Sequence, residues 1–186
     1  MADLISRDDR NVAEQPRPCG SCSFCCKIIP VAALEKPANT WCTHFAKGVG
    51  CSIHAERPGA CRDFQCLWTF AVVLDDRWRP DNCKFVMRPG PGQEFVIDVD
   101  PAHPDAWKSE PFYSQIKAWS DRSSGAYQMV MVRAGGRLMV VFPEGEVDLG
   151  PELPGRGVES GYGTNRDGKM YRYANYAPPN LPAANP

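Results

Sequence analysis

The chain has 186 residues, of which 43% are hydrophobic and 23% are charged, and its formal net charge is −1. At about 150 residues per domain, this length predicts one domain, or one domain with an appendage, and the hydrophobic content excludes a broadly disordered chain. A net charge near zero argues against nucleic acid or an anionic membrane as the main partner, because both require a basic surface.

The amino terminus and the hydropathy of the chain predict a cytoplasmic location. The first ten residues contain no apolar run long enough for the core of a signal peptide. No window of about 18 apolar residues exists that could span a membrane. In a reducing compartment thiols stay free, so cysteine clusters there hold metal more often than they form disulfides.

Composition divides the chain into four parts. Residues 1–15 are polar and are expected to be a flexible arm, residues 16–80 hold a cysteine cluster, residues 81–149 show an α+β pattern, and residues 150–186 form a tail rich in Gly and Pro. We therefore expect an α+β fold, in which a small, turn-rich, metal-stapled cysteine lobe with one helix packs on a β-hairpin and helix segment.

The one helix of the cysteine lobe is predicted to begin at Pro58, because the missing N–H of proline costs nothing in a first helical turn. Apolar side chains then recur at helical spacing until Asp75 and Asp76 end the pattern. These side chains are Cys61, Phe64, Leu67 or Trp68, and Ala71 or Val72. Before Pro58 the chain is expected to form short turns between cysteines.

Two hairpins are predicted in the third part of the chain. Strand-like segments 84–88 and 94–99 flank a Pro-Gly-Pro-Gly turn. Segments 127–133 and 137–142 flank Ala-Gly-Gly, whose glycines supply the positive φ that tight hairpins need.

A helix is predicted between these hairpins. Ser109 can cap it and Pro111 suits its first turn, while Phe112, Ile116 and Trp119 share one face.

The last part is expected to be extended or disordered, apart from a short strand over 169–173. The glycine-rich segment 161–168 lacks the Gly-Lys-Ser/Thr ending of a phosphate-binding loop and is predicted to be a flexible loop. Neither a Ser-His-Asp triad nor a paired-carboxylate site has local support, so the sequence leaves open whether the protein is an enzyme.

Eight of the nine cysteines lie in the second part and are the candidate ligands of a metal centre. Each C-x2-C step lets one turn aim two thiolates at one centre. Three ligands from one loop with a fourth from elsewhere is the arrangement of bacterial iron–sulfur loops, whereas zinc accepts four cysteines, or three and a histidine. The sequence thus predicts an iron–sulfur cluster, [4Fe–4S] in type, or zinc. The ligands are Cys19, Cys22, Cys25, Cys26, Cys42, Cys51, Cys61 and Cys66.

The adjacent pair Cys25 and Cys26 limits how these ligands can be shared, because neighbouring side chains diverge. Either the two cysteines serve different centres, or one of them is a ligand and the other packs. Eight cysteines would fill two four-ligand sites, or one site with four thiols left over. Spacing does not decide between these arrangements.

Four stretches of the cysteine-rich part form a recognisable pattern. They are Cys19-Gly-Ser-Cys-Ser-Phe-Cys-Cys26, Trp41-Cys42-Thr43-His44, Gly50-Cys51 and Arg57-Pro58-x-x-Cys61-Arg62-x-Phe64-x-Cys66. This pattern resembles the YkgJ-like cysteine-cluster family. These CxxCxxCC proteins are described as zinc- or iron-chelating domains. The resemblance covers residues 17–70 and extends more loosely to about residue 148. It implies a cytoplasmic bacterial protein with a bound metal or iron–sulfur centre, and it implies no particular reaction.

Other polar residues have two interpretations each. His44 and His54 could complete a mixed zinc site or donate to sulfur from a second layer, while His103 is expected to lie in a turn. Arg57 and Arg62 could offset the negative charge of thiolates or pair with nearby carboxylates. Cys83, outside the cluster, is expected to be a packed thiol.

Three functions fit these observations. The first is an iron–sulfur protein in electron transfer or in support of a redox or group-transfer enzyme. The second is a structural zinc module that recognises a protein partner. The third is a protein that stores or delivers zinc or iron, for which thiols beyond four would be useful.

Overall fold

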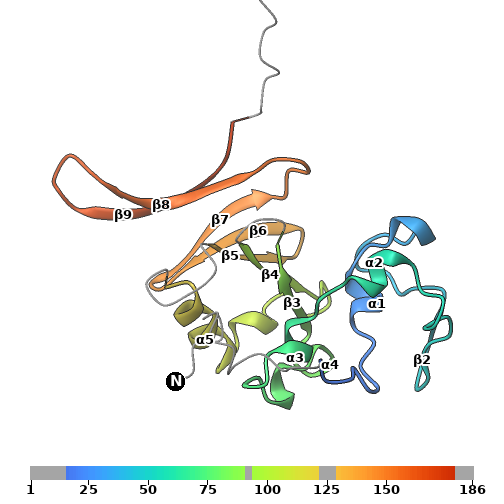
Figure 1. Cartoon of the computed structure of the whole chain (residues 1–186). Helices are drawn as coiled ribbons and strands as arrows, with labels where there is room; N and C mark the ends of the chain where they lie inside the picture. The colour runs from blue at the N-terminus through green and yellow to red at the C-terminus, as the bar shows by residue number, and fades with distance from the viewer. Residues whose placement is uncertain (1–15, 91–93, 122–128, 179–186) are drawn as a thin grey trace, which may run out of the picture.

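The computed structural model describes residues 16–90, 94–121 and 129–178, and within them it is a mixed α and β structure with short helices and several β-sheets (Figure 1). The largest sheet has five strands in the order β3-β4-β5-β6-β7. These are β3 (Phe85–Pro89), β4 (Glu94–Val99), β5 (Met129–Ala134), β6 (Arg137–Phe142) and β7 (Gly145–Pro151).

Both predicted hairpins are confirmed over their described residues. β3 pairs antiparallel with β4, and β5 pairs antiparallel with β6. Gly135 and Gly136 have φ of 58° and 76° at the second turn, which a side chain would disfavour. The start of the expected strand over 127–133 and most of the first turn lie outside the described residues.

The two hairpins belong to one sheet because β4 and β5 pair parallel. A parallel pair requires a crossover connection, and here the crossover carries α5 (Phe112–Trp119). The predicted apolar face of this helix is confirmed, since Ile116 and Trp119 are buried. The predicted cap is wrong: Pro111 is the N-cap, and Ser109 contributes only its carbonyl, to the N–H of Tyr113.

Strand alternation divides the apolar residues between the two faces of the sheet. Phe95, Ile97 and Val99 point into the main core with the α5 side chains, whereas Val96 faces a second, smaller cluster. The second cluster is covered by a hairpin of β8 (Val158–Thr164) and β9 (Met170–Tyr176), which contributes the buried Ala174 (Figure 1).

This hairpin corrects the expectation for the last part of the chain. The strand over 169–173 is present and extends to Tyr176, but Gly161–Thr164, expected as loop, lie in β8. The side chains of Tyr173 and Tyr171 lie across Gly161 and Gly163, where a Cβ would approach the Tyr173 hydroxyl to 3.0 Å and the Tyr171 ring to 2.8 Å. The glycines therefore serve close strand packing rather than loop flexibility.

The cysteine-rich part contains short elements in place of one helix. They are α1 (Cys25–Ile28), a 3₁₀ turn (Ala32–Leu34), β1 (Phe45–Ala46), β2 (Gly50–Cys51), α2 (Gly59–Arg62), α3 (Leu67–Phe70), a second 3₁₀ turn (Asp76–Trp78) and α4 (Pro80–Cys83). The predicted helix from Pro58 is broken between Arg62 and Leu67, since Cys66 is extended at ψ 119°. The sequence after Pro58 has helical periodicity, but the structure has no continuous helix there.

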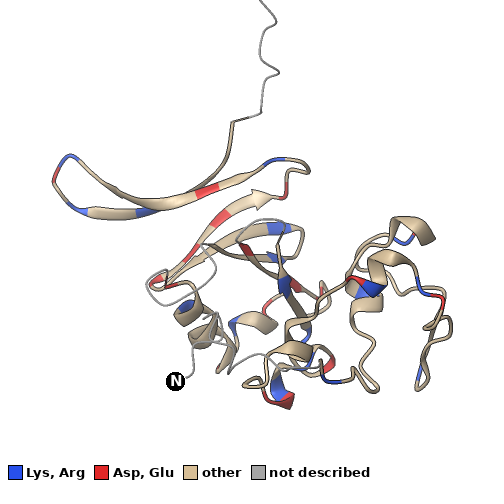
Figure 2. Ribbon diagram, in the orientation of Figure 1, with Lys and Arg blue, Asp and Glu red and all other residues tan. Residues whose placement is uncertain are grey.

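Two contacts hold the cysteine-rich part against the edge of the large sheet. Phe24 and Ile28 of α1 pack with Val86 of β3, and Trp68, Leu74 and other residues of 67–78 join the main core. Basic and acidic residues are interspersed along the whole ribbon (Figure 2). Within the described ranges, no helix combines the length and apolar composition needed to cross a bilayer.

Candidate metal centre

The first loop of the candidate centre is a tight turn that leads into α1. The N–H of Cys22 donates to the carbonyl of Cys19 at 3.0 Å, and Gly20 between them has φ 58°. Only glycine adopts that conformation without strain, which explains the Cys-Gly-Ser-Cys sequence. The turn lies directly ahead of the helix that carries Cys25 and Cys26, and Cys19 and Cys22 interact electrostatically across it.

Cys25 and Cys26 are successive residues of α1, so their side chains leave the helix about 100° apart. The thiol of Cys25 donates a hydrogen bond to the sulfur of Cys26, which raises the pKa of Cys25 and lowers that of Cys26. Beyond this contact the two thiols have different neighbours. Cys25 interacts electrostatically with Cys19 and Cys66, whereas Cys26 interacts with Lys36 and Cys61.

Cys19 and Cys66 interact with Cys25, and Cys22 interacts with Cys19 and Cys66; we call these four residues set A, although Cys19 also interacts with Cys26. Cys66 interacts electrostatically with Cys19 and Cys22, although it lies 40 or more positions away in sequence. Burial raises the pKa of Cys66 to about 12, and burial also raises the pKa of Cys19 and Cys22. The thiols of set A are therefore protonated at neutral pH.

Arg17 brings the two distant parts of set A together. Its N–H donates to the carbonyl of Thr69 at 2.8 Å. Its guanidinium donates to the carbonyls of Trp68, Ala71 and Leu74 at 2.5–2.8 Å and stacks 4.3 Å from the Trp68 ring. The Arg17 side chain thus satisfies carbonyls at and beyond the C-terminal end of α3. It also fixes the segment just before Cys19 close to the segment just after Cys66.

Replacing Arg17 with methionine is expected to lower the free energy of unfolding by about 1.5–3 kcal/mol, because hydrogen bonds to a charged group contribute that much. Denaturant titration of the purified variant measures the change. Arg17→Lys is the matched control: it keeps the charge but not the fork of donors, and should lose less. An unchanged midpoint in Arg17→Met would show that the carbonyls find other donors.

The neighbours of Cys26 form set B, which consists of Cys26, Cys42, Cys51 and Cys61. The N–H of Cys42 donates to the carbonyl of Cys26 at 3.0 Å. The chain then turns, with Phe45 donating to the carbonyl of Cys42, and Phe45 pairs with Cys51 across β1 and β2. Cys61 interacts electrostatically with the other three members of the set, and its pKa is raised, first by burial.

The residues predicted as accessory groups take different places. His54 and Arg57 contact each other, Nδ1 to Nη1 at 3.2 Å, and the Arg57 charge acts on Cys19 and Cys61. Arg62 donates to the carbonyl of Arg57. His44 contributes its carbonyl, which accepts from Ser52. The Arg57 charge lowers the pKa of Cys19 and Cys61 less than burial raises it, and among the described residues no ion pair joins Arg57 or Arg62 to a carboxylate.

His103 and Cys83 follow their predictions. His103 lies in a bend, where its N–H donates to the carbonyl of Asp100. Cys83 is 2% exposed and belongs to the main core. Its thiol contacts the carbonyls of Trp78 and Phe85, and burial raises its pKa to about 12.

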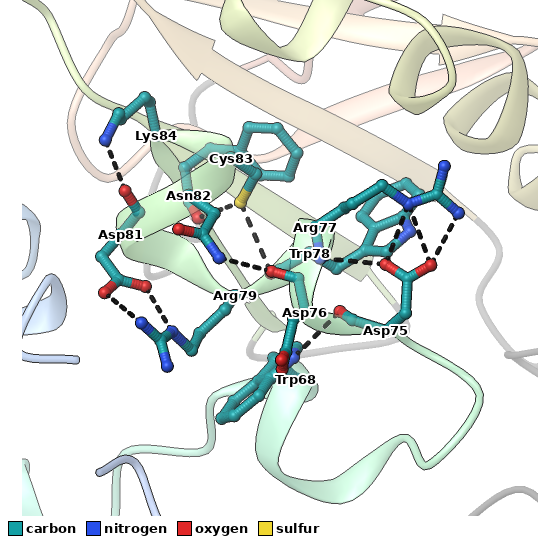
Figure 3. Close-up of polar contacts among 11 residues, drawn as sticks. Trp68, Asp75, Asp76, Arg77, Trp78, Arg79, Asp81, Asn82, Cys83 and Lys84 are labelled. Carbon is teal, nitrogen blue, oxygen red and sulfur yellow. Dashed lines mark hydrogen bonds and ion pairs between the residues drawn. The ribbon is translucent and has the colours of Figure 1, made fainter. Parts of the chain in front are cut away.

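Residues 75–84 form a network of hydrogen bonds and ion pairs (Figure 3). Arg79 binds Asp81 through two hydrogen bonds of 2.7 and 2.8 Å, and the Cys22 thiol also donates to this carboxylate. Burial raises the pKa of Asp81, but these hydrogen bonds and the Arg79 charge outweigh burial and leave it lowered. The carboxylate is thus a fixed, ionised neighbour of one cysteine. Sequence spacing alone did not suggest it.

An ion pair connects α1 to the end of β4. Lys27 Nζ lies 2.7 Å from both carboxylate oxygens of Asp100, whose side chain is only 2% exposed. Burial raises the pKa of Asp100, but the hydrogen bonds from Lys27 and from the N–H of Ala102 outweigh it and leave the pKa lowered.

Because the pKa of Asp100 is lower in the folded than in the unfolded chain, its contribution to stability is complete above the unfolded pKa of about 3.9. The contribution is lost as the pH falls through the folded pKa. We expect Asp100→Asn to cost about 1.5–3 kcal/mol at neutral pH and to flatten the acid limb of the stability curve. Denaturant titrations between neutral pH and pH 3 test this, and an acid limb as steep as that of wild type would contradict it.

The thiols of set A and set B lie near one another, but they are not close enough together to form a metal site. Among the residues that the structure describes, no group of three or more His, Cys, Asp or Glu side chains lies close enough to hold a metal ion as it stands. No protein-family model, no curated protein and no solved structure matches the chain. The resemblance to the YkgJ-like family and the metal-stapled character of the lobe stay predictions.

Proposed function

We propose that the chain is a metal-binding protein in which set A and set B each hold one centre, either a [4Fe–4S] cluster or zinc, and that it acts in redox chemistry or electron transfer. One observation supports the proposal: Cys66 interacts electrostatically with Cys19 and Cys22, whereas Cys61 interacts with Cys26, Cys42 and Cys51, and the contact of Cys19 with Cys26 links the two sets. Four sulfurs are the number that either a [4Fe–4S] cluster or a tetrahedral zinc ion takes.

The chemistry of the donors supports this assignment. All eight are thiols, and thiolate sulfur is the ligand both of iron–sulfur clusters and of structural zinc. All eight thiols are free. Seven of them are partly buried, and Cys19 is exposed.

A structural zinc module that binds a protein partner is the second candidate, and the packing of the lobe favours it. Between residues 16 and 62 the longest helix has four residues, and the buried apolar residues are Phe24, Ile28 and Val31. So small an apolar core orders little chain, and structural zinc often makes up the difference. Storage or delivery of zinc or iron is the third candidate function.

Anaerobic purification followed by measurement of iron, zinc and acid-labile sulfide in one sample tests these functions. Brown protein with about equal iron and sulfide supports electron transfer by clusters. Colourless protein with two tightly held zinc ions supports the structural module, and zinc that exchanges readily with a competing chelator supports storage or delivery. Folded protein without any metal would overturn the proposal.

A further inference from the structure

The hairpin of β8 and β9 lies over one face of the large sheet (Figure 1), and its other side carries two exposed aromatic rings. Ala174 is buried in the second core cluster, so strand alternation turns Tyr173 and Tyr171 to the opposite side of the hairpin. Tyr173 is 37% exposed and Tyr171 is 52% exposed. Their partners across the two strands are Gly161 and Gly163. We call the two rings the tyrosine platform.

The two glycines let the tyrosine rings fold down onto β8 instead of projecting from the hairpin. The outer end of the Tyr173 ring lies over Gly161, and that of Tyr171 lies over Gly163. The inner side of each ring is thus covered by backbone, while the outer side is open. Among the described residues, neither hydroxyl has a hydrogen-bond partner. Such rings offer apolar area and a hydrogen bond at a low cost in conformational entropy, which is typical of binding surfaces.

A proline-rich chain has the chemistry that fits the tyrosine platform. In a polyproline II helix the carbonyls make no internal hydrogen bonds, so they are free to accept from tyrosine hydroxyls, while the prolines pack on aromatic rings. This helix rises about 3.1 Å per residue, which places the prolines of a Pro-x-x-Pro segment about 9 Å apart. Tyr171 and Tyr173 are two positions apart on one strand, or about 7 Å. The spacings are similar enough for each ring to contact one proline.

A Pro-x-x-Pro segment occurs directly after this hairpin. It is Pro179-Asn180-Leu181-Pro182, and two residues separate it from the end of β9. The segment lies outside the described residues, and its proline content favours the polyproline II conformation. Every copy of the protein therefore carries both the tyrosine platform and a segment of the chemistry that fits it.

The way the hairpin ends favours a second copy as the partner over the same copy. The N–H of Ala177 donates to the carbonyl of Gly157 at 2.8 Å, and the Arg156 guanidinium donates to the carbonyl of Ala177 at 2.9 Å. These bonds continue the hairpin beyond the last residue of β9. Ala177 and Pro178 each precede a proline, so both favour extended backbone over a tight reversal. The segment is thereby directed away from its own tyrosines, which lie back along β9.

We propose that the tyrosine platform binds the Pro-x-x-Pro segment of a second copy, so that the protein self-associates through its last hairpin. The two contacting surfaces differ, so the contact is heterologous. It closes into a dimer if two copies exchange segments, and it continues from copy to copy if they do not. The contact uses none of the cysteines and is independent of the proposed metal binding.

Sedimentation velocity over a series of protein concentrations measures this association, in reducing buffer so that disulfides do not form. Wild-type protein is expected to shift from monomer to larger species as its concentration rises, whereas a chain truncated after Pro178 should stay monomeric. Pro179→Ala combined with Pro182→Ala should weaken association about tenfold or more, the usual loss for an interface anchor. Asn185→Ala, outside the segment, is the control. Wild-type protein that stays monomeric throughout would overturn the inference.

Variants of the tyrosine platform test the other side of the contact. Tyr171→Ser combined with Tyr173→Ser should weaken association by a similar factor. Met170→Ser is the matched control, because Met170 is 67% exposed in the same strand but lies on the face opposite the platform. If the double variant does not fold, Tyr171→Ser alone repeats the comparison at the more exposed ring. Equal association in the platform variant and in Met170→Ser would contradict the proposal.

Mixing the two kinds of variant isolates the contact itself. The chain truncated after Pro178 keeps the platform, and the tyrosine variant keeps the segment. Neither should self-associate, but an equimolar mixture of the two should form a one-to-one complex, which a general loss of folding in either variant would not produce. Titration of a synthetic peptide of residues 177–186 into the truncated chain gives the affinity. No complex in the mixture, or peptide binding that survives substitution of both tyrosines, would overturn the inference.

Discussion

Replacing Cys66 with serine is expected to halve the metal content of the protein, since it removes the centre proposed for set A and leaves the one proposed for set B. Cys61→Ser should have the converse effect, and the double variant should bind none. The reason is that Cys66 interacts with Cys19 and Cys22, whereas Cys61 interacts with Cys26, Cys42 and Cys51. Metal analysis of protein purified without oxygen gives the stoichiometry.

Cys83→Ser is the control for this prediction. Cys83 is also a free, hidden thiol, but it lies in the apolar core among Trp78 and Phe85, so its replacement should leave the metal content unchanged. If either Cys66→Ser or Cys61→Ser removed all metal, the eight cysteines would have to serve a single centre. If neither removed any, the assignment of the ligands would be wrong.

Truncation of Phe85 to alanine is expected to destabilise the fold by about 3–5 kcal/mol, the usual cost of emptying a buried phenylalanine site. Phe85 is fully buried at the start of β3. Its ring contacts Trp78 and Phe112 edge-on, with centroids 6.2 and 5.2 Å away. It therefore joins the end of the cysteine-rich part, the sheet and α5, and few neighbouring groups can move to fill its space.

Denaturant titration followed by tryptophan fluorescence measures this loss. Val72→Ala is the control, because Val72 is apolar and near in sequence but 50% exposed, and surface substitutions of this kind change stability by about 0.5 kcal/mol or less. A loss below about 1.5 kcal/mol for Phe85→Ala would mean that the junction of these three elements is loosely packed.

Local patterns predicted the parts of the sheet that are made from neighbouring segments. Residues 94–99 and 137–142 are mostly apolar and bounded by turn residues, and Gly135 and Gly136 specify the turn between β5 and β6. Ile116 and Trp119 gave the buried face of α5. In each case the signal and the structure it produces lie within about ten residues of each other, which is the range that periodicity and turn chemistry cover.

Pairings between distant segments were not predicted. The parallel pair of β4 and β5 joins segments about 30 positions apart. Neither strand carries a local sequence signal that identifies the other as its partner. β7 and β8 were missed because Gly145, Gly150, Gly161 and Gly163 lower the apparent strand propensity. The helix expected from Pro58 failed because the chain turns at Cys66, where tertiary contacts override periodicity.

For the candidate centre, the sequence predicts the donors but not their grouping. The C-x2-C steps point to the thiols, and the adjacency of Cys25 and Cys26 leaves one centre and two centres open. The structure adds contacts between distant segments, which local patterns do not predict: the Arg17 side chain donates to the carbonyl of Trp68, and the N–H of Cys42 donates to the carbonyl of Cys26.

The cysteine-rich part also shields an edge of the large sheet. β3 is the outermost strand of that sheet, and its residues Phe85, Val86 and Met87 are at most 1% exposed because α1, α3 and α4 lie against it (Figure 1). An uncovered apolar edge strand is a template for pairing with another molecule. Any condition that loosens the cysteine-rich part, oxidation of its thiols included, would thus expose a surface prone to intermolecular aggregation.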